Sequence, residues 1–195
     1  MKLKSFLLLT VAIATMQQAQ AQSFEKGDNV ITLGAGFGGY YTGLYSSYSA
    51  QTPAIGVAYE HAMNFNVGPG VLGMGGYIGH KSLRSHGRFS SLNYDYDYRW
   101  TYTIIGFRTA YHWNEWHHVD KLDMYAGLML GYNVVAFRDK SDYPSDVTKY
   151  SYSSASGMGV SGYAGARYYF TDAFGVFGEV GFGHSYITLG AALKF

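Results

Sequence analysis

Apolar and polar residues alternate with a period of two over most of the chain. The last ten residues show the pattern most clearly. Their apolar positions are Ile187, Leu189, Ala191, Leu193 and Phe195. The positions between them are small or polar: Thr188, Gly190, Ala192 and Lys194. A period of two is typical of a β-strand whose two faces meet different surroundings.

The same alternation recurs in other segments, for example over 122–137 and 174–182. We therefore predict antiparallel strands separated by polar connections, with ends defined only to within a few residues. The eight predicted strands cover roughly 29–44, 53–64, 70–83, 99–113, 122–138, 154–170, 174–183 and 186–195.

The connections between these strands alternate in length. One set lies at 45–52, 84–98, 139–153 and 184–185, and three of its members are long and rich in Tyr, Ser and Asp. The other set is shorter and lies at 65–69, 114–121 and 171–173. Short periplasmic turns and longer outer loops are the rule in outer-membrane barrels, so an even strand count places both termini on the periplasmic side.

Composition favours the same architecture. The chain has 26 Gly, 20 Tyr and 12 Phe but only 3 Pro, and 14% of its residues are charged, well below the usual quarter. It has no Cys, which excludes disulfides and thiolate metal sites, and its net charge of +1 argues against nucleic-acid binding. With no long apolar run after the N-terminus, a closed barrel is the remaining way to cross a membrane. The predicted fold class is all-β, a transmembrane antiparallel up-and-down β-barrel of eight strands.

The first residues have the pattern of a secretory signal peptide. Lys2 and Lys4 precede a short apolar run, and a small-x-small site ends at Ala21. The alternative, an N-terminal membrane anchor, needs a longer apolar run to span a bilayer as a helix. We expect a signal peptide at 1–21, a barrel domain at 22–195, and localisation in the outer membrane.

Strand parity places most charged residues on the predicted lumen face, together with most glycines. A narrow barrel needs small inward residues, and a charge facing lipid at the bilayer midplane would cost about 2–4 kcal/mol. Four of these residues lie at similar depth and predict a buried ion network: Glu60, Arg108, Arg167 and Glu179. Arg167 and Glu179 are expected to be diagonal neighbours across the sixth turn. The network is interpreted as a plug, and a proton or ion path is the alternative.

Aromatic residues flank the predicted apolar band, as expected where amphipathic rings meet headgroups. Those assigned to the periplasmic girdle are Trp113, Trp116, Phe170, Phe174 and Phe195. Those assigned to the outer girdle are Tyr41, Tyr98, Trp100, Phe137 and Tyr186.

The C-terminal strand resembles the terminal motif by which outer-membrane barrels are recognised for assembly. Its alternating apolar positions map to Ile187, Leu189, Ala191 and Leu193, and its terminal aromatic residue maps to Phe195. In pattern, the whole of 22–195 resembles the small OmpA/OmpX-like barrels of the porin family. The resemblance implies periplasmic chaperones and the barrel-assembly machinery as partners. It implies no single activity, because a fold does not determine a function.

One pair of residues suggests an enzyme. Some eight-stranded barrels are lipid A deacylases with His and Ser two positions apart on a lipid-facing strand, and His80 and Ser82 have that spacing. Their flanking residues differ from the family motif. Glu60 points inward near the other end, so no carboxylate orients His80. We expect no catalytic residues and no enzyme activity.

Two further segments carry ligand-binding residue types. His112, His117 and His118 surround a Trp-rich turn, for which an interfacial anchor is favoured over metal binding, and no metal or other cofactor is expected. The outer loops carry Tyr, Ser and five aspartates that suit adaptable binding but lack EF-hand spacing. These aspartates are Asp95, Asp97, Asp139, Asp142 and Asp146.

The favoured function is structural, a compact barrel that stabilises the envelope and displays surface loops. The alternatives are a small-solute pore and an adhesin or resistance factor acting through loops 84–98 and 139–153. Outer-membrane lipid and lipopolysaccharide are the expected surroundings. The chain is expected to be a monomer.

Overall fold

The computed structural model describes residues 23–39, 49–89, 94–143 and 156–195. No helix in these segments is long and apolar enough to cross a membrane. The described residues form nine strands: β1 (Asn29–Phe37), β2 (Ala50–Gln51), β3 (Ala54–Val67), β4 (Gly70–Phe89), β5 (Tyr94–His112), β6 (Leu122–Asp139), β7 (Gly157–Tyr169), β8 (Phe174–Phe182) and β9 (Ile187–Lys194).

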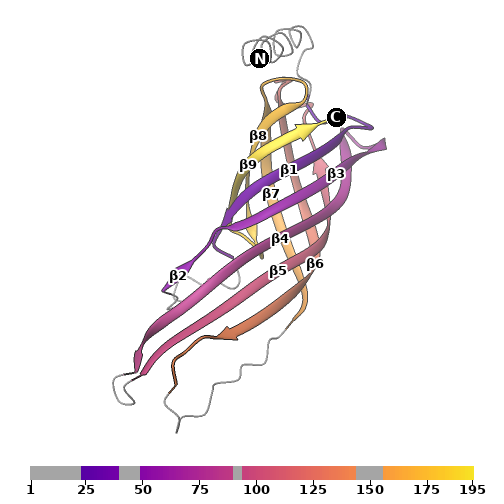
Figure 1. The fold of residues 1–195 in the computed structure, drawn as a ribbon. Helices are drawn as coiled ribbons and strands as arrows, with labels where there is room; N and C mark the ends of the chain where they lie inside the picture. Colours follow the sequence, from indigo (N-terminus) through magenta and orange to yellow (C-terminus); the bar gives the residue numbers. More distant parts are fainter. Residues whose placement is uncertain (1–22, 40–48, 90–93, 144–155) are drawn as a thin grey trace, which may run out of the picture.

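Eight of the described strands close into an antiparallel barrel (Figure 1). β1 pairs with β3 on one side and with β9 on the other, and the ladder continues through β8, β7, β6 and β5. Pairing of β5 with β4 completes the ring. The predicted fold is therefore confirmed. The two-residue strand β2 lies outside this ring and pairs with β4 at Arg84 and Leu83.

The two faces of each strand differ because successive side chains point to opposite sides of a strand. In β1, Val30 is fully buried, whereas Leu33 is 55% exposed. In β6, Met129 is buried between the exposed residues Leu128 and Leu130. The sequence alternation thus separates a packed lumen from an apolar exterior.

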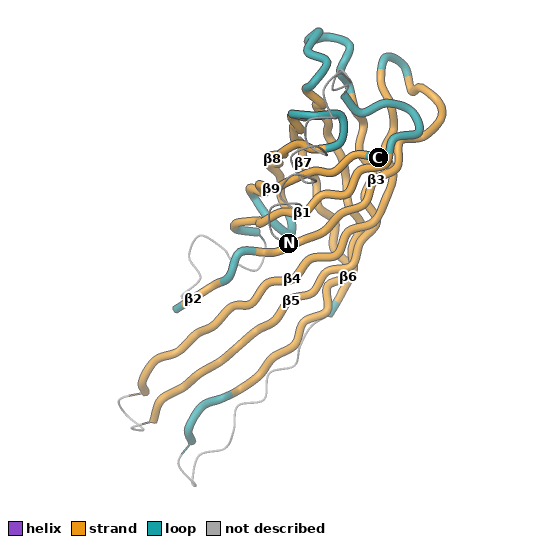
Figure 2. Tube along the Cα trace, turned by 45° about the horizontal axis from the view of Figure 1, so that its top comes forward, coloured by secondary structure: helices purple, strands orange, loops and turns teal. Residues whose placement is uncertain are grey.

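The barrel has two unlike ends. At the turn end, β1 begins beside the last residue, Phe195, and the connections at 68–69, 113–121 and 170–173 are short. At the opposite end, the loop end, β4 and β5 continue well beyond the shorter strands β1, β8 and β9 (Figure 2).

The prediction of a loop at 84–98 was wrong, because strands fill most of this range. β4 and β5 remain paired residue by residue as far as Phe89 and Tyr94. Tyr and Asp alternate in this segment, which is a strand pattern. The polar composition of the segment nevertheless favoured the prediction of a loop. A bidentate ion pair joins the two strands there: Arg84 Nε is 2.7 Å from Asp97 Oδ1, and Arg84 Nη2 is 2.9 Å from Asp97 Oδ2.

Other predicted boundaries shift by smaller amounts. The first strand ends at Phe37 rather than 44, and two glycines with positive φ follow it, Gly38 and Gly39. The second barrel strand continues to Val67 through a register shift after Ala62. The predicted signal peptide at 1–21, residues 40–44 of the first strand, and 144–153 of the fifth connection lie outside the described residues.

Candidate functional site: the charged barrel lumen

A cluster of four charged or ionisable side chains fills the lumen near the turn end. Glu60 comes from β3, His112 from β5, Asp123 from β6 and Arg167 from β7. All four are almost completely buried. Arg167 donates hydrogen bonds to Glu60 and, at 3.3 Å, to Asp123. We call this group the four-residue cluster.

His112 lies between the two carboxylates of this cluster. Its Nδ1 is 2.7 Å from Asp123 Oδ1, and its Nε2 is 3.0 Å from Glu60 Oε1. Ionised carboxylates accept hydrogen bonds but donate none, so both contacts are favourable only when both ring nitrogens carry protons. With His112 charged in this way, the two anions and two cations of the four-residue cluster sum to zero.

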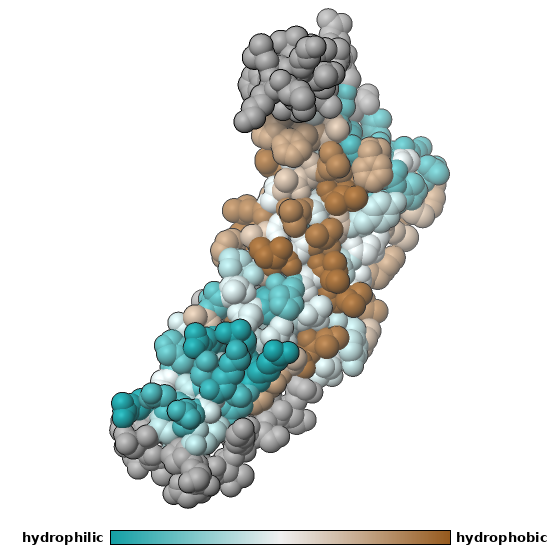
Figure 3. All heavy atoms as spheres, in the orientation of Figure 1, coloured by the Kyte–Doolittle hydropathy of each residue, from teal (hydrophilic) through white to brown (hydrophobic). Residues whose placement is uncertain are grey.

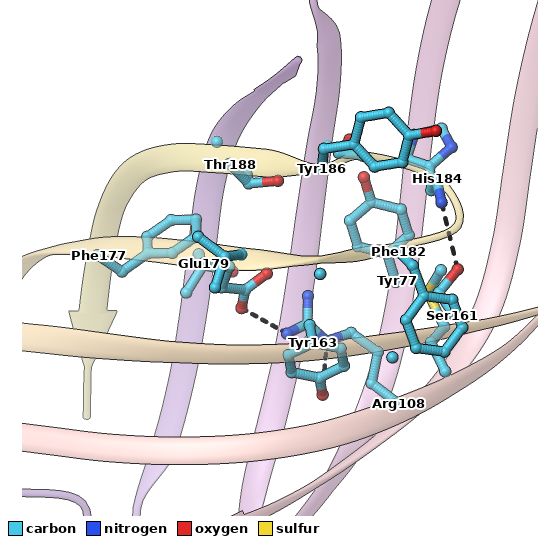
Figure 4. A pocket seen from close by; sticks show the side chains of 18 residues that line it. Tyr77, Arg108, Ser161, Tyr163, Phe177, Glu179, Phe182, His184, Tyr186 and Thr188 are labelled. Atoms are coloured by element: carbon cyan, nitrogen blue, oxygen red, sulfur yellow. Dashed lines mark hydrogen bonds and ion pairs between the residues drawn. The ribbon is translucent and has the colours of Figure 1, made fainter. Parts of the chain in front are cut away.

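A second ion pair lies further into the barrel. Arg108 Nη2 is 2.6 Å from Glu179 Oε1, and Arg108 also donates to the Tyr163 hydroxyl at 3.2 Å (Figure 4). The Arg108 guanidinium stacks on the Tyr163 ring, 4.0 Å from its centroid. Both charged side chains are about nine-tenths buried.

Tyr125 connects the four-residue cluster with this second pair. Its hydroxyl donates to Glu179 Oε1 at 2.9 Å, and the Arg167 guanidinium lies over its ring at 4.4 Å from the centroid. The six lumen groups therefore form one continuous set of three anions and three cations. Such pairing offsets much of the cost of removing the charges from water.

The four predicted network residues occupy this lumen set, but their pairing differs from the expectation. Arg167 and Glu179 are close in the β7–β8 register, where Gly165 is opposite Glu179. Arg167 instead contacts Asp123, which is directly opposite it on the neighbouring strand β6, and Glu60 of β3. Glu179 pairs with Arg108 of β5. Asp123 and His112 were not among the predicted network residues.

Glycine on β4 makes room for this arrangement. A Cβ added at Gly73 would overlap the Glu60 carboxylate and lie 2.9 Å from its Cδ. β4 separates β3 from β5, so a side chain at Gly73 would stand between Glu60 and His112. The small residue thus permits contact between strands that are not neighbours.

A small cavity of about 50 Å³ adjoins the Arg108–Glu179 pair on the side of the loop end. Tyr77, Ser161 and His184 are among its polar lining residues (Figure 4). Neither His184 ring nitrogen has a hydrogen-bond partner among the described residues, although the residue is only 7% exposed. A space of this size with several polar lining groups can hold a few water molecules.

Apolar side chains cover both ends of the lumen. At the turn end, Phe24 is 2% exposed and its ring lies 4.0 Å from the His112 ring. At the loop end, Leu83, Tyr102 and Val135 form a buried cluster. Buried side chains thus close the described lumen near both of its ends.

The assignment of three aromatic residues to an outer lipid-facing girdle was wrong. Tyr98, Trp100 and Phe137 have the parity of the lumen face, and their rings contact one another at centroid distances of 5.3–6.0 Å. The error arose because these residues were grouped by height along the barrel and not by strand parity. Tyr41 lies outside the described residues.

The residues proposed for other chemistry lie apart from one another. His80 is on the outer face and contacts the Thr103 hydroxyl at 2.9 Å, and no described carboxylate forms an ion pair with it. His112 belongs to the lumen, whereas His117 and His118 lie in the turn. Among the described residues, no group of three His, Cys, Asp or Glu side chains is placed to hold a metal ion.

The aspartates assigned to outer loops are distributed over strands and connections. Asp95 and Asp97 belong to β5, and Asp139 ends β6, where its carboxylate accepts a 2.6 Å hydrogen bond from Tyr143. Asp142 follows β6, and Asp146 lies outside the described residues. The C-terminal apolar residues Ile187, Leu189, Leu193 and Phe195 all lie exposed on the barrel exterior, each about half exposed or more.

No protein-family profile matches the chain, and no curated protein matches it. The solved structures that are similar to it include two of the outer membrane protein Ail of Yersinia pestis. The structure in a phospholipid bilayer nanodisc has a TM-score of 0.44 and 14% identity, covering 87% of this chain and 100% of that one. The complex with the heparin analogue sucrose octasulfate has a TM-score of 0.42 and 15% identity, covering 88% and 100%.

Proposed function

We propose that this chain is an integral outer-membrane β-barrel with a structural role in the envelope and no catalytic activity. The observation that carries the proposal is the inverted placement of polarity. Ion pairs fill the inside of the barrel, whereas large apolar side chains lie on its outside, and Figure 3 shows them gathered over the middle of one face. A soluble protein has the opposite arrangement.

The apolar exterior continues around the ring. Every barrel strand has a large apolar side chain that is about half exposed, for example Leu33, Ile55, Ile78, Ile105, Leu130, Val160, Val180 and Leu189. Soluble monomers rarely expose a contiguous apolar surface of this extent. Closure also pairs the backbone groups within the barrel, as residence in lipid requires.

The outer membrane is the proposed location because the first 21 residues have a secretory signal pattern and closed barrels occupy that membrane. The turn end would then face the periplasm and the β4–β5 hairpin the outside. Outer-leaflet lipid and lipopolysaccharide would surround the barrel. The exterior residues Ile187, Leu189, Leu193 and Phe195 would serve as the assembly signal for chaperones and the barrel-assembly machinery.

Fractionation of cells that express the full chain tests this proposal. We expect the processed protein in the outer-membrane fraction, migrating differently on gels before and after boiling, because a closed barrel resists detergent until heated. A processed chain found dissolved in the periplasm, with identical migration before and after boiling, would contradict it.

Conductance separates the structural role from the alternative of a small-solute pore. Because the lumen set and Phe24 fill the described interior, the purified protein in a planar bilayer should give no large, stable current steps. A known porin in the same bilayer is the positive control. Large, stable current steps at neutral pH would favour the pore and would contradict the proposal that the lumen side chains plug the barrel.

The protruding hairpin favours a second function, display of a binding surface. β4 and β5 carry cross-strand ion pairs beyond the ring, so this part of the sheet is ordered where a loop was expected. Replacing 86–97 by Asn-Gly would join Ser85 and Tyr98, which are directly opposite, through a two-residue turn. If the hairpin is an adhesin, cells expressing this variant should lose attachment to extracellular matrix while the barrel still forms. Unchanged attachment would exclude it.

A further inference from the structure

Three arginines lie directly opposite one another on the outer face of the barrel wall. Arg84 of β4 is opposite Arg99 of β5, which is opposite Arg138 of β6. We call these residues the arginine row. Neighbouring strands are about 4.8 Å apart, and like charges placed directly opposite are destabilising. The row therefore needs anions nearby.

Carboxylates in the described part of the chain compensate only one end of the row. Asp97 holds Arg84 through two hydrogen bonds of 2.7 and 2.9 Å. No described salt bridge includes Arg99 or Arg138, and Lys140, directly after the end of β6, adds a further cation near Asp97. Hydrogen bonds from Arg84, with smaller contributions from the charges of Arg99 and Lys140, hold the pKa of Asp97 below its usual value. One carboxylate is thus shared among several cations.

The row lies just beyond the apolar part of the exterior. Ile78, Ile105 and Tyr132 form a cross-strand row on the same face, six positions closer to the turn end. The two rows between them mix polar and apolar residues: His80, Thr103 and Val134, then Ser82, Thr101 and Ala136. This change from apolar to charged rows is expected where a membrane passes from hydrocarbon to headgroups.

Strand geometry gives the height of the row. The segment from Trp113 to Arg99 rises about 35 Å at a strand tilt near 40°, whereas the apolar band of such barrels is about 25 Å tall. With Trp113 at the periplasmic interface, Arg99 reaches the level of the outer headgroups.

We propose that the arginine row binds a phosphate group of an outer-leaflet glycolipid, with Arg99 and Arg138 as its main ligands. This inference rests on the proposed function, because the phosphate is supplied by the surrounding membrane. A planar guanidinium can donate two parallel hydrogen bonds to a phosphate, and its weak hydration suits an interface. Two guanidinium groups on adjacent strands can share one phosphate, which relieves their mutual repulsion.

The test titrates the folded full-length barrel in detergent micelles with phosphorylated lipid A, and with the same lipid after phosphatase treatment. Native mass spectrometry counts the bound lipid. We expect the phosphorylated form to bind wild-type protein at least tenfold more tightly. The Arg99→Gln/Arg138→Gln variant should bind both forms equally. Lys26→Gln/Lys121→Gln, which removes two exposed cations from the turn end, should keep the wild-type preference.

Equal binding of the two lipids by wild-type protein would overturn the proposal, as would a phosphate preference retained by Arg99→Gln/Arg138→Gln. The wild-type comparison decides the question even if the variant folds poorly. Heat-dependent gel migration is recorded for every sample. A folded barrel without phosphate preference contradicts only this inference, whereas a chain that forms no barrel contradicts the proposed function as well.

Discussion

Replacing Arg167 by Met should cause the largest loss of stability among single substitutions in the lumen. Arg167 contacts Glu60 and Asp123, which are 7% and 0% exposed, and its removal leaves two buried carboxylates with one imidazolium. Breaking a buried ion pair by removing one partner costs about 3–5 kcal/mol. Urea unfolding in lipid vesicles should show a correspondingly lower midpoint.

Two further variants make this result specific. Arg88→Met changes an arginine whose side chain is 63% exposed near the tip of the β4–β5 hairpin, and it should alter the free energy of unfolding by less than about 0.5 kcal/mol. Arg167→Lys keeps the charge, but lysine cannot donate to two carboxylates in the same way. Its urea midpoint should therefore lie between those of Arg167→Met and wild type. An unchanged urea midpoint for Arg167→Met would show that the four-residue cluster does not stabilise the barrel.

Gly73→Val should produce the second largest effect. A Cβ at this position overlaps the Glu60 carboxylate, so the variant must displace Glu60 from His112 and Arg167 or distort β4. Overpacking of this kind typically costs about 1–3 kcal/mol, and loss of a buried contact adds to it. Valine favours strands intrinsically, so a decrease in stability could not arise from strand propensity.

The matched control is Gly157→Val. Gly157 also lies in a barrel strand, but no atom of the described residues lies within 4 Å of a Cβ added there. We expect the urea midpoint of this variant to equal or exceed that of wild type. Equal losses for Gly73→Val and Gly157→Val would mean that valine is unfavourable at either site for a reason unrelated to Glu60.

Strand parity made the inner and outer faces predictable from sequence. Because side chains alternate between the two faces of a strand, the position of each residue along the strand determines whether it faces the lumen or the exterior. Glu60, Arg108, Arg167 and Glu179 were therefore assigned to the lumen correctly. The pairs that span the lumen, Glu60–Arg167 and Arg108–Glu179, were not predictable in the same way, because such contacts depend on barrel curvature and on which intervening residues are glycine.

His112 shows a signal that could have been used. It has the same parity as Arg108 four residues earlier, which places it in the lumen. Its closeness in sequence to His117 and His118 suggested a turn residue instead. The outer end of β4 and β5 was missed for a different reason, since ion pairs such as Arg84–Asp97 stabilise a strand pairing that polar composition alone does not reveal.

A membrane location requires that the apolar face of each strand contacts lipid. The chain has no native Cys, so single cysteines can report on individual positions. Ile105 is 59% exposed, whereas its neighbour Ile104 is 2% exposed, and Leu130 and Met129 form a second such pair. Each position is changed to Cys, labelled with a small fluorophore and reconstituted in vesicles of brominated lipid.

Bromine quenches only fluorophores that it can approach closely. Strong quenching is predicted for Ile105→Cys and Leu130→Cys, and weak quenching for Ile104→Cys and Met129→Cys. Equal quenching within each pair, or stronger quenching at the lumen positions, would contradict the claim that this barrel presents its apolar face to a membrane.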